Sequence, residues 1–508
     1  MNRILKNTAT VGAFTALSRV LGLVREMLQS RFIGAGVEQS AFTLAFALPN
    51  MARKLFGEGA LTAAFVPVFK GEVEAQAMES ARRLARAVLT MSLLMLGAIV
   101  TLAFLGLEAA VHFRVGLEMT GRTLLTVRLV KTLLPYMIFI CGAAFGMGVL
   151  NAMGRFKASS AMPCLLNVFW IGMLLWICFH PELKLDQRIH RVSMAILVAG
   201  AVQMAFMLWC MHRAGVTPGL ALKGWADVKV RLVWRNTAIA AMGAGAVQIN
   251  YMLDQVLGQV AAPWAAGVIG YAERLMDLPL GVIGVAFGTV LLPTFAGLFA
   301  KGDVEGAREA FVSSSRQMLF VMVPAAVGLG VLAPDVTTVI YRGGAFDAMA
   351  VVRVSRAVAV YAVGLGFFGL QKSLVPWFQA QNDMKTPLRV SVYTVCLNAV
   401  LNILAVAFLP VEWRHVGLAA STTLCAGCGC ALLVHAARRR NGSLGMRRLA
   451  RPVAKMLLGS ALMAAAVVGV RAFAADLLPV LSLAFAIAAG GATYFASMAA
   501  MGLRWKRK

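Results

Sequence analysis

Continuous apolar runs follow one another along the whole chain, and the polar stretches between them are short. A run of about 20 residues crosses about 30 Å of hydrocarbon as an α-helix. The runs do not alternate between apolar and polar residues, which excludes a transmembrane β-barrel. The pattern predicts fourteen transmembrane helices, at residues 9–33, 40–69, 86–111, 123–150, 158–180, 192–212, 236–260, 264–299, 314–340, 354–380, 388–409, 415–436, 452–474 and 478–503.

Composition supports an all-α polytopic membrane protein with little soluble mass. The 508 residues are 60% hydrophobic and 14% charged, whereas a soluble protein has about 25% charged residues. The first run contains Arg19 and Arg25 and lacks a small-residue cleavage site, so we expect it to be retained as a span. Cys425, Cys428 and Cys430 lie in an apolar run without His or acidic partners at ligand spacing. We therefore predict neither a metal site nor a cofactor.

The basic residues indicate the orientation of the chain in the membrane. Fourteen spans place 29 of the 48 Lys and Arg residues in loops on the side that holds both termini, against 11 on the other side. Cytoplasmic loops carry the excess of basic residues, so we expect both termini in the cytoplasm. Membrane topology thus explains the formal net charge of +26, and we exclude nucleic acid as a partner.

Two pairs of similar segments predict an internal repeat. PVFKGEVEAQA (67–77) matches PTFAGLFAKGDVEGA (293–307), and NAMGRFKASSAMPCLLNV (151–168) matches QAQNDMKTPLRVSVYTVCLNAV (379–400). Lys70 and Lys301, like Asn167 and Asn398, are 231 residues apart. The offset is six spans, an even number, so the halves are parallel and related by a pseudo-twofold axis along the membrane normal.

The repeat predicts two six-helix lobes and an additional pair of helices. The expected boundaries are 1–215 for the N-terminal lobe, 216–437 for the C-terminal lobe, and 438–508 for the last two spans. The basic segment HAARRRNGSLGMRRLARPVAK precedes those two spans. We interpret it as an anchor on anionic lipid, worth about 1 kcal/mol per basic residue near the surface.

Charged residues within spans are the candidates for function. A charge in hydrocarbon costs at least ~2.5–3.5 kcal/mol, so such residues normally face a wet interior and mark a pathway. Arg19 and Arg25 lie in the first span, and Arg53 and Glu58 lie in the second. Arg19 and Arg25 are about 120° apart around an ideal helix, so both face one cavity only if the helix bends or breaks, for which Gly22 offers a place.

The segment GYAERLMDLPLG in the eighth span carries a second charged cluster. Glu273 and Asp277 share a helix face, whereas Arg274 is rotated by about 100°. We expect the charges of spans 1, 2 and 8 to meet at the lobe interface. Asp254 in span 7 and Asp383 in a cytoplasmic loop are candidates for a cation site.

Several arginines at membrane depth suit an anion with two phosphates. The guanidinium group stays charged, and its planar fork binds phosphate or carboxylate with two hydrogen bonds. The nearby acids would pair with the arginines when no ligand is present. The competing interpretation is a set of salt bridges that only joins helices; we favour a binding site because so many charges exceed what packing requires.

Several motifs spread over nearly the whole chain are specific in combination. They are SRVLG at 18–22, FIGAG at 32–36, AF with LPN at 41–50, FVP at 65–67, YAERLM with LP at 271–279, LLP at 291–293 and D with KTP at 383–387. In this combination the chain resembles the MviN/MurJ family, the lipid II flippases of bacterial cell-wall synthesis. That family belongs to the multidrug/oligosaccharidyl-lipid/polysaccharide exporter superfamily.

The resemblance implies a V of two six-helix lobes, a central cationic cavity formed by spans 1, 2, 7 and 8, and a groove at spans 13 and 14 for an undecaprenyl tail. It assigns substrate binding to one set of residues and a supporting role to the cavity acids: Arg19, Arg25, Arg53 and Arg274, with Glu58, Glu273 and Asp277. The family often has Asp where this chain has Ser40, so that role is dispensable here or is taken by Glu38.

The resemblance also implies a function: a flippase of the bacterial inner membrane that moves lipid II by alternating access, without making or breaking a bond. Membrane potential or a coupled cation would drive it, since moving one charge through 100 mV yields ~2.3 kcal/mol. The expected partners are lipid II and membrane lipids. We expect a monomer, with cell-wall synthesis or division proteins as further candidate partners.

Three alternatives remain open from the residues. A flippase for another lipid-linked polysaccharide and a drug/cation exporter share the fold, although a cation exporter should carry acids rather than arginines in its cavity. A membrane-embedded glycosyltransferase needs a catalytic acid on a sizeable outer loop, and the outer loops here are short.

Overall fold

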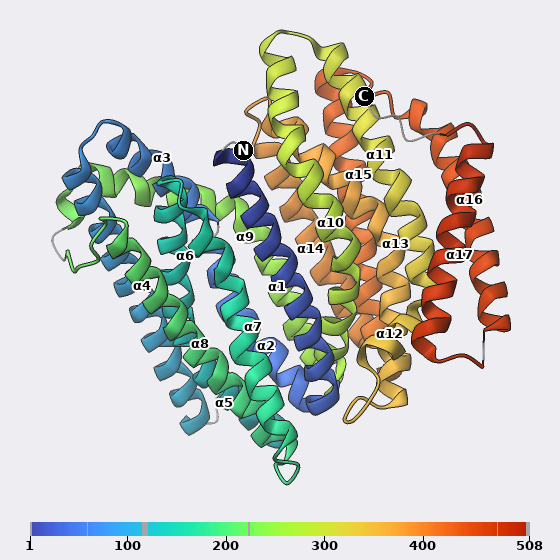
Figure 1. Cartoon of the computed structure of the whole chain (residues 1–508), viewed down its shortest axis with the longest axis horizontal. Helices are drawn as coiled ribbons and strands as arrows, with labels where there is room; N and C mark the ends of the chain where they lie inside the picture. The colour runs from blue at the N-terminus through green and yellow to red at the C-terminus, as the bar shows by residue number, and fades with distance from the viewer. Residues whose placement is uncertain (1–2, 58, 114–119, 222–223, 475, 504–508) are drawn as a thin grey trace. The chain divides into compact units, whose positions relative to one another are not determined.

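The structure is a computed structural model that describes residues 3–57, 59–113, 120–221, 224–474 and 476–503. The side chains at 3–10, 57, 242–244, 246–247, 282–286 and 288–289 lie outside the description. The described residues form helices and one isolated β-bridge, between Gly343 and Phe346 (Figure 1). The predicted all-α fold is therefore confirmed.

The chain divides into two compact units. Unit 1 comprises Met1–Gln259 and Gly343–Phe346, and unit 2 comprises Val260–Arg342 and Asp347–Lys508. Unit 1 contains α1 (Arg3–Ile33), α2 (Val37–Ala52), the π-helical turn η1 (Arg53–Gly57), α3 (Ala60–Glu74), α4 (Met78–Phe113), α5 (Gly121–Leu133), α6 (Tyr136–Ala152), α7 (Phe156–Cys178), α8 (Leu185–Arg213), the 3-10 turn η2 (Gly224–Ala226) and nearly all of α9 (Val228–Ala261). Unit 2 contains α10 (Ala265–Ala300), α11 (Val304–Val331), α12 (Ala333–Tyr341), α13 (Ala348–Gln379), α14 (Lys385–Phe408), α15 (Val411–Asn441), α16 (Arg447–Phe473) and α17 (Pro479–Ala500).

Ten described helical segments are long and apolar enough to cross a membrane. They correspond to ten predicted spans: α4, α5 with α6, α7, α8, α11, α13, α14, α15, α16 and α17. The prediction of a polytopic membrane protein is thereby confirmed. The other four predicted spans correspond to α1, α2 with α3, α9 and α10, which carry the charges or include side chains outside the description. The count of fourteen stays a prediction.

The first two predicted spans differ in continuity. α1 runs uninterrupted from Arg3 to Ile33, so the helix is not broken at Gly22. The second span is instead two helices, because α2 gives way to the π-helical turn Arg53–Gly57 before α3 begins. Pro49 within α2 has no N–H to donate to the preceding turn, which weakens the helix just before this change. π-helical turns are rare and often mark functional sites.

Equivalent helices of the predicted repeat have equivalent neighbours within their own units. In unit 1, α6 packs against α4 and α8, and α7 packs against α8. In unit 2, α13 packs against α11 and α15, and α14 packs against α15. The pseudo-twofold axis itself stays a prediction.

Large aromatic side chains fill the core of unit 2. Trp377 of α13 has no exposed surface, and Phe295, Phe299 and Phe311 meet its ring edge to face. Outside this core, α16 and α17 lie side by side, and α16 packs on α11 (Figure 1). The Tyr494 hydroxyl donates to Phe320 O at 2.8 Å, which fixes α17 to α11.

Candidate functional site

Arg25 lies at the contact between α1 and α7 and is held by side chains of both helices. Its side chain is 13% exposed, and its Nη1 donates to Asn167 Oδ1 at 3.0 Å. Nη2 lies 2.5 Å from Glu26 Oε1, and the guanidinium carbon lies 4.4 Å from the centre of the Trp170 ring. Asn167 also donates through Nδ2 to Ser18 O at 3.1 Å. The α1–α7 contact therefore fixes the Arg25 guanidinium group between two helices, and one of its nitrogens is bound to the Glu26 carboxylate.

A row of buried polar groups continues from Arg25 toward α2. Trp170 Nε1 donates to Gln29 Oε1 at 3.0 Å, and Gln29 Nε2 donates to Gln39 Oε1 at 3.0 Å. Gln39 Nε2 in turn reaches Thr43 Oγ1 at 3.4 Å. Polar side chains buried in this way need partners, because an unpaired one costs roughly 1–3 kcal/mol. The sequence analysis missed this row; the only signal was Gln29, one helical turn after Arg25.

The other two arginines of unit 1 are placed differently. Arg19 is exposed on α1, on a different face from Arg25, as the spacing of six residues in a continuous helix requires. Arg53 begins the π-helical turn, and its Nη2 donates to Asn50 Oδ1 at 3.0 Å. The neighbouring Lys54 ammonium lies 5.3 Å from the centre of the Tyr251 ring of α9. Glu58, the predicted acidic partner, lies outside the described residues.

Asp254 is a buried carboxylate on α9. It is 3% exposed and accepts from Asn250 Nδ2 at 3.4 Å. One helical turn further along α9, Gln259 Nε2 donates to Ser40 O at 2.5 Å, and Arg122 Nη2 donates to Gln259 O at 2.9 Å. Ser40 itself is fully buried. This end of α9 is thereby fixed to α2 and α5.

The predicted acids of the eighth span lie in unit 2. On α10, Glu273 is half-buried, whereas Arg274 and Asp277 are exposed. Arg19, Arg25, Arg53 and Asp254 belong to unit 1. A site shared by these two groups stays a prediction.

Asp383 caps a helix at the loop before α14. Its Oδ1 accepts from Thr386 N at 3.0 Å, and its Oδ2 accepts from Thr386 Oγ1 at 2.7 Å and from Arg440 Nη1 at 2.8 Å. Burial opposes ionisation, but the two Thr386 hydrogen bonds and the Arg440 charge outweigh it and lower the pKa of the carboxyl below its ordinary value. Helix capping accounts for these contacts, and a cation site at Asp383 stays an untested prediction.

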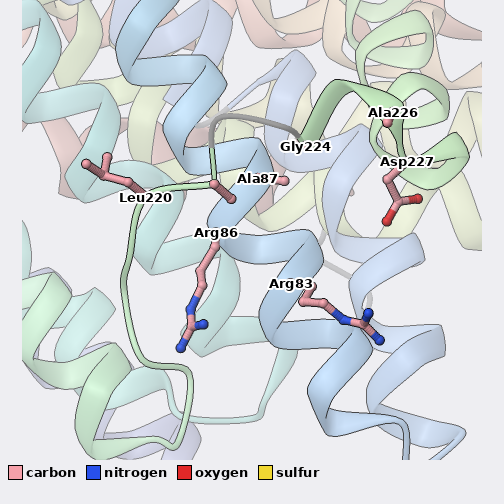
Figure 2. Close-up of a pocket in the computed structure, with 8 residues that line it drawn as sticks. Arg83, Arg86, Ala87, Leu220, Gly224, Ala226 and Asp227 are labelled. Atoms are coloured by element: carbon pink, nitrogen blue, oxygen red, sulfur yellow. The ribbon is translucent and has the colours of Figure 1, made fainter.

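A pocket of about 730 Å³ lies between α4 and the linker 214–227, which joins α8 to α9 (Figure 2). Three α4 side chains at successive helical turns fix the linker: Arg82 Nε donates to Gly215 O at 2.6 Å, Arg86 Nε donates to Thr217 O at 2.8 Å, and Thr90 Oγ1 accepts from Ala221 N at 3.0 Å. The pocket is lined by Arg83, Arg86, Ala87, Leu220, Ala221, Gly224, Ala226 and Asp227. None of the predicted site residues is among them.

The ion pair between Glu72 of α3 and Lys229 of α9 lies just beyond this linker. Lys229 Nζ is 2.6 Å from Glu72 Oε1 and 3.5 Å from Ser80 Oγ. The hydrogen bond from Lys229, and after it one from Ser80 to the same carboxylate, lower the pKa of Glu72 below its ordinary value of 4.5, although burial acts in the opposite direction. The beginning of α9 is therefore fixed to α3 and α4 of unit 1.

Comparison with known proteins gives one consistent family. The family model described as "Lipid II flippase MurJ" matches residues 29–488. A probable lipid II flippase MurJ of Rhizobium tropici is 33% identical over 92% of this chain and 86% of its own length. A lipid II flippase MurJ of Burkholderia cenocepacia is 32% identical over 83% of this chain and 81% of its own length.

Solved structures show the same fold at lower sequence identity. A structure titled lipid II flippase MurJ, inward closed conformation, has a TM-score of 0.79 at 20% identity and covers 97% of this chain and 98% of its own. An inward-facing multidrug resistance MATE family transporter of the MOP superfamily has a TM-score of 0.69 at 14% identity, over 84% of this chain and 96% of its own.

Proposed function

The chain belongs to the lipid II flippase MurJ family, and we propose that it carries lipid II across the inner membrane from the cytoplasmic to the periplasmic face. The family match over residues 29–488 is the observation that carries this proposal. The ten apolar spans and the fold shared with solved transporters support it. The chain is accordingly a transporter that makes and breaks no bond, and it is not an enzyme.

We propose that Arg25 is the first arginine to bind the lipid diphosphate. Its guanidinium group is held against Trp170 and Asn167, while the contact with Glu26 is the one that an anion can replace. Phosphate oxygens accept charge-assisted hydrogen bonds in the same planar geometry as a carboxylate. Glu26 thus does for Arg25, in the absence of substrate, what the sequence analysis expected of the acids near the arginines.

The remaining arginines and acids complete the proposed site. Arg19 and Arg53 would contribute from unit 1, and Arg274 from unit 2, with Glu58, Glu273 and Asp277 balancing the charge. The two lobes, 1–215 and 216–437, would alternate between inward and outward access while the undecaprenyl tail stays in lipid beside residues 438–508. Apolar side chains exposed on α16 and α17, such as Val468 and Phe485, support that last assignment.

Asp254 is the proposed point of coupling to a cation. A buried carboxylate at membrane depth is costly without a function, and Asp254 is 3% exposed. Movement of one charge through a potential of 100 mV supplies ~2.3 kcal/mol. The proposal includes cytoplasmic termini, a monomer, and cell-wall synthesis or division proteins as candidate partners.

The test is transport by the purified full chain in vesicles loaded with lipid II, with the outward-facing headgroup detected by a membrane-impermeant enzyme. Wild type should expose the headgroup. Arg25→Ala should bind lipid II about ten- to a hundred-fold more weakly, the equivalent of ~1.5–3 kcal/mol for hydrogen bonds to a charged group. Arg83→Ala, which removes an exposed arginine of α4, is the matched control and should transport normally.

Two results would contradict the proposal at different levels. Wild-type protein that moves another lipid-linked glycan but not lipid II would replace the substrate. Normal binding and transport by Arg25→Ala would remove Arg25 from the site while leaving the substrate unchanged. A drug/cation exporter is not favoured, because the family match is to lipid II flippases.

A further inference from the structure

The turn between α12 and α13 clusters with a different unit from the helices that it joins. Gly343–Phe346 belongs to unit 1, whereas α12 and α13 lie in unit 2. The turn is closed on itself, since Gly343 N donates to Phe346 O at 3.2 Å and Phe346 N donates to Gly343 O at 3.1 Å. The Phe346 side chain is 1% exposed. The four-residue turn thus groups with unit 1, and its aromatic side chain is buried.

A main-chain hydrogen bond fixes this turn to the end of α1. Ala345 N donates to Arg31 O at 2.8 Å. Arg31 lies in the last turn of α1, where carbonyl groups have no partner within the helix. The turn supplies a donor that the helix end lacks, so the contact depends on backbone geometry rather than on a particular side chain.

Glycine is required on both sides of the contact. Gly344 has φ +56°, and a Cβ there would lie 2.3 Å from Arg31 O. Gly34 has φ +80°, and a Cβ there would lie 2.4 Å from Ala345 O. Any other residue at either position would separate the two segments. In the predicted topology, both segments are loops on the side of the membrane opposite the termini.

We propose that this contact is a releasable interlock: the turn Gly343–Phe346 sits on Arg31–Gly34 to hold the outer end of the transporter closed, and it separates each time that end opens. The interlock rests on the proposed transport function. The contact is small, with one main-chain hydrogen bond and one buried aromatic side chain, Phe346, so separation uncovers little apolar surface.

Cross-linking the two segments tests the interlock in the full chain. A Cβ on Gly343 would lie 3.7 Å from Arg31 Cγ, close to where a cysteine sulfur at position 31 would lie, so the pair Arg31→Cys with Gly343→Cys should form a disulfide. In vesicles, the oxidised pair should lose lipid II transport at least ten-fold, and reduction should restore it. Wild type and Arg31→Cys, treated with the same oxidant, should transport normally, and the reduced pair serves as the reference because Gly343 has φ +139° and a cysteine there is itself strained. Lipid II binding to the oxidised pair, measured by native mass spectrometry, should be retained.

The outcomes separate the interlock from the transport function. Wild-type protein without lipid II transport would overturn the proposed function. Wild-type transport together with unchanged transport by a fully oxidised pair, verified by peptide mass spectrometry, would overturn the interlock alone.

A second variant tests the interlock without a cross-link. Gly344→Ala should speed hydrogen exchange at the Ala345 amide at least ten-fold, because the added methyl group displaces the turn from Arg31 O. Gly106→Ala on α4 is the control, since a Cβ there would meet nothing within 4 Å. Slow exchange at Ala345 in Gly344→Ala would contradict the assigned contact.

Discussion

The hydrogen bond between Asn167 and Arg25 should contribute more to the stability of the protein than the other hydrogen bond that the Asn167 side chain makes. Asn167→Ala removes the hydrogen bond to Arg25 Nη1 and the one to Ser18 O. A hydrogen bond to a charged group contributes about 1.5–3 kcal/mol, and a neutral one contributes about 0.5–1.5 kcal/mol. The free energy of unfolding should therefore fall by about 2–4 kcal/mol, and most of that loss should depend on Arg25 being present.

A double-mutant cycle isolates this coupling. The free energy of unfolding is measured by denaturant titration in detergent for wild type, Asn167→Ala, Arg25→Ala and the double variant. The coupling energy between the two residues should be about 1.5–3 kcal/mol. Arg53, which bonds Asn50 instead, supplies the control cycle with Asn167, and its coupling should be near zero. A coupling below about 0.5 kcal/mol between Asn167 and Arg25 would refute the reasoning, because separate sites add within that margin.

Three further results are expected. Glu72→Gln should lower the melting temperature at neutral pH. The pKa of Glu72 in the folded protein lies below its ordinary value of 4.5, so its stabilising effect is complete above the unfolded pKa and is lost as the pH falls through the folded pKa. Wild type and Glu72→Gln should therefore have the same melting temperature in acid. Gly224→Val should lower the melting temperature and increase proteolysis of the linker, because a Cβ at Gly224 would lie 2.4 Å from that of Ala87; normal stability would show that the linker is not clamped there. Asp383→Asn should lower stability through its lost capping and ionic contacts while leaving the cation dependence of transport unchanged, and a changed dependence would instead support the predicted cation site.

Much of the architecture could be predicted because membrane insertion imposes its requirements on local sequence. In lipid, the backbone of an apolar run can form all its hydrogen bonds only as a helix. Ten spans can therefore be identified from composition and length alone. The interruption of the second span was not predicted, since the change from α-helix to a π-helical turn at Arg53 depends on Pro49 and on what packs around the turn. The pattern of apolar residues does not distinguish a continuous α-helix from one that is interrupted by a π-helical turn.

The sequence predicted which type of residue forms the site but not which side chains contact one another there. The cost of burying charge singled out Arg25 without reference to any fold. Its hydrogen-bond partner Asn167 is 142 residues away in the sequence. The Trp170 ring also contacts Arg25 and is itself hydrogen-bonded to Gln29. Asn167 entered the sequence analysis only as a marker of the repeat. Hydrogen bonds between distant segments cannot be read from spacing, because they depend on which helix faces are brought together.

The sequence by itself determined that this chain spans a membrane many times, that it carries arginines where lipid forbids them, and that its motifs are those of lipid II flippases. The first two properties follow from hydrophobicity and charge, which act residue by residue, and the third rests on the resemblance of the motifs to that family. The tertiary structure decided that Arg25 faces α7 while Arg19 faces elsewhere, that Asp383 caps a helix, and that the turn Gly343–Phe346 meets the end of α1. These are questions of direction and close approach, which only a packed backbone fixes.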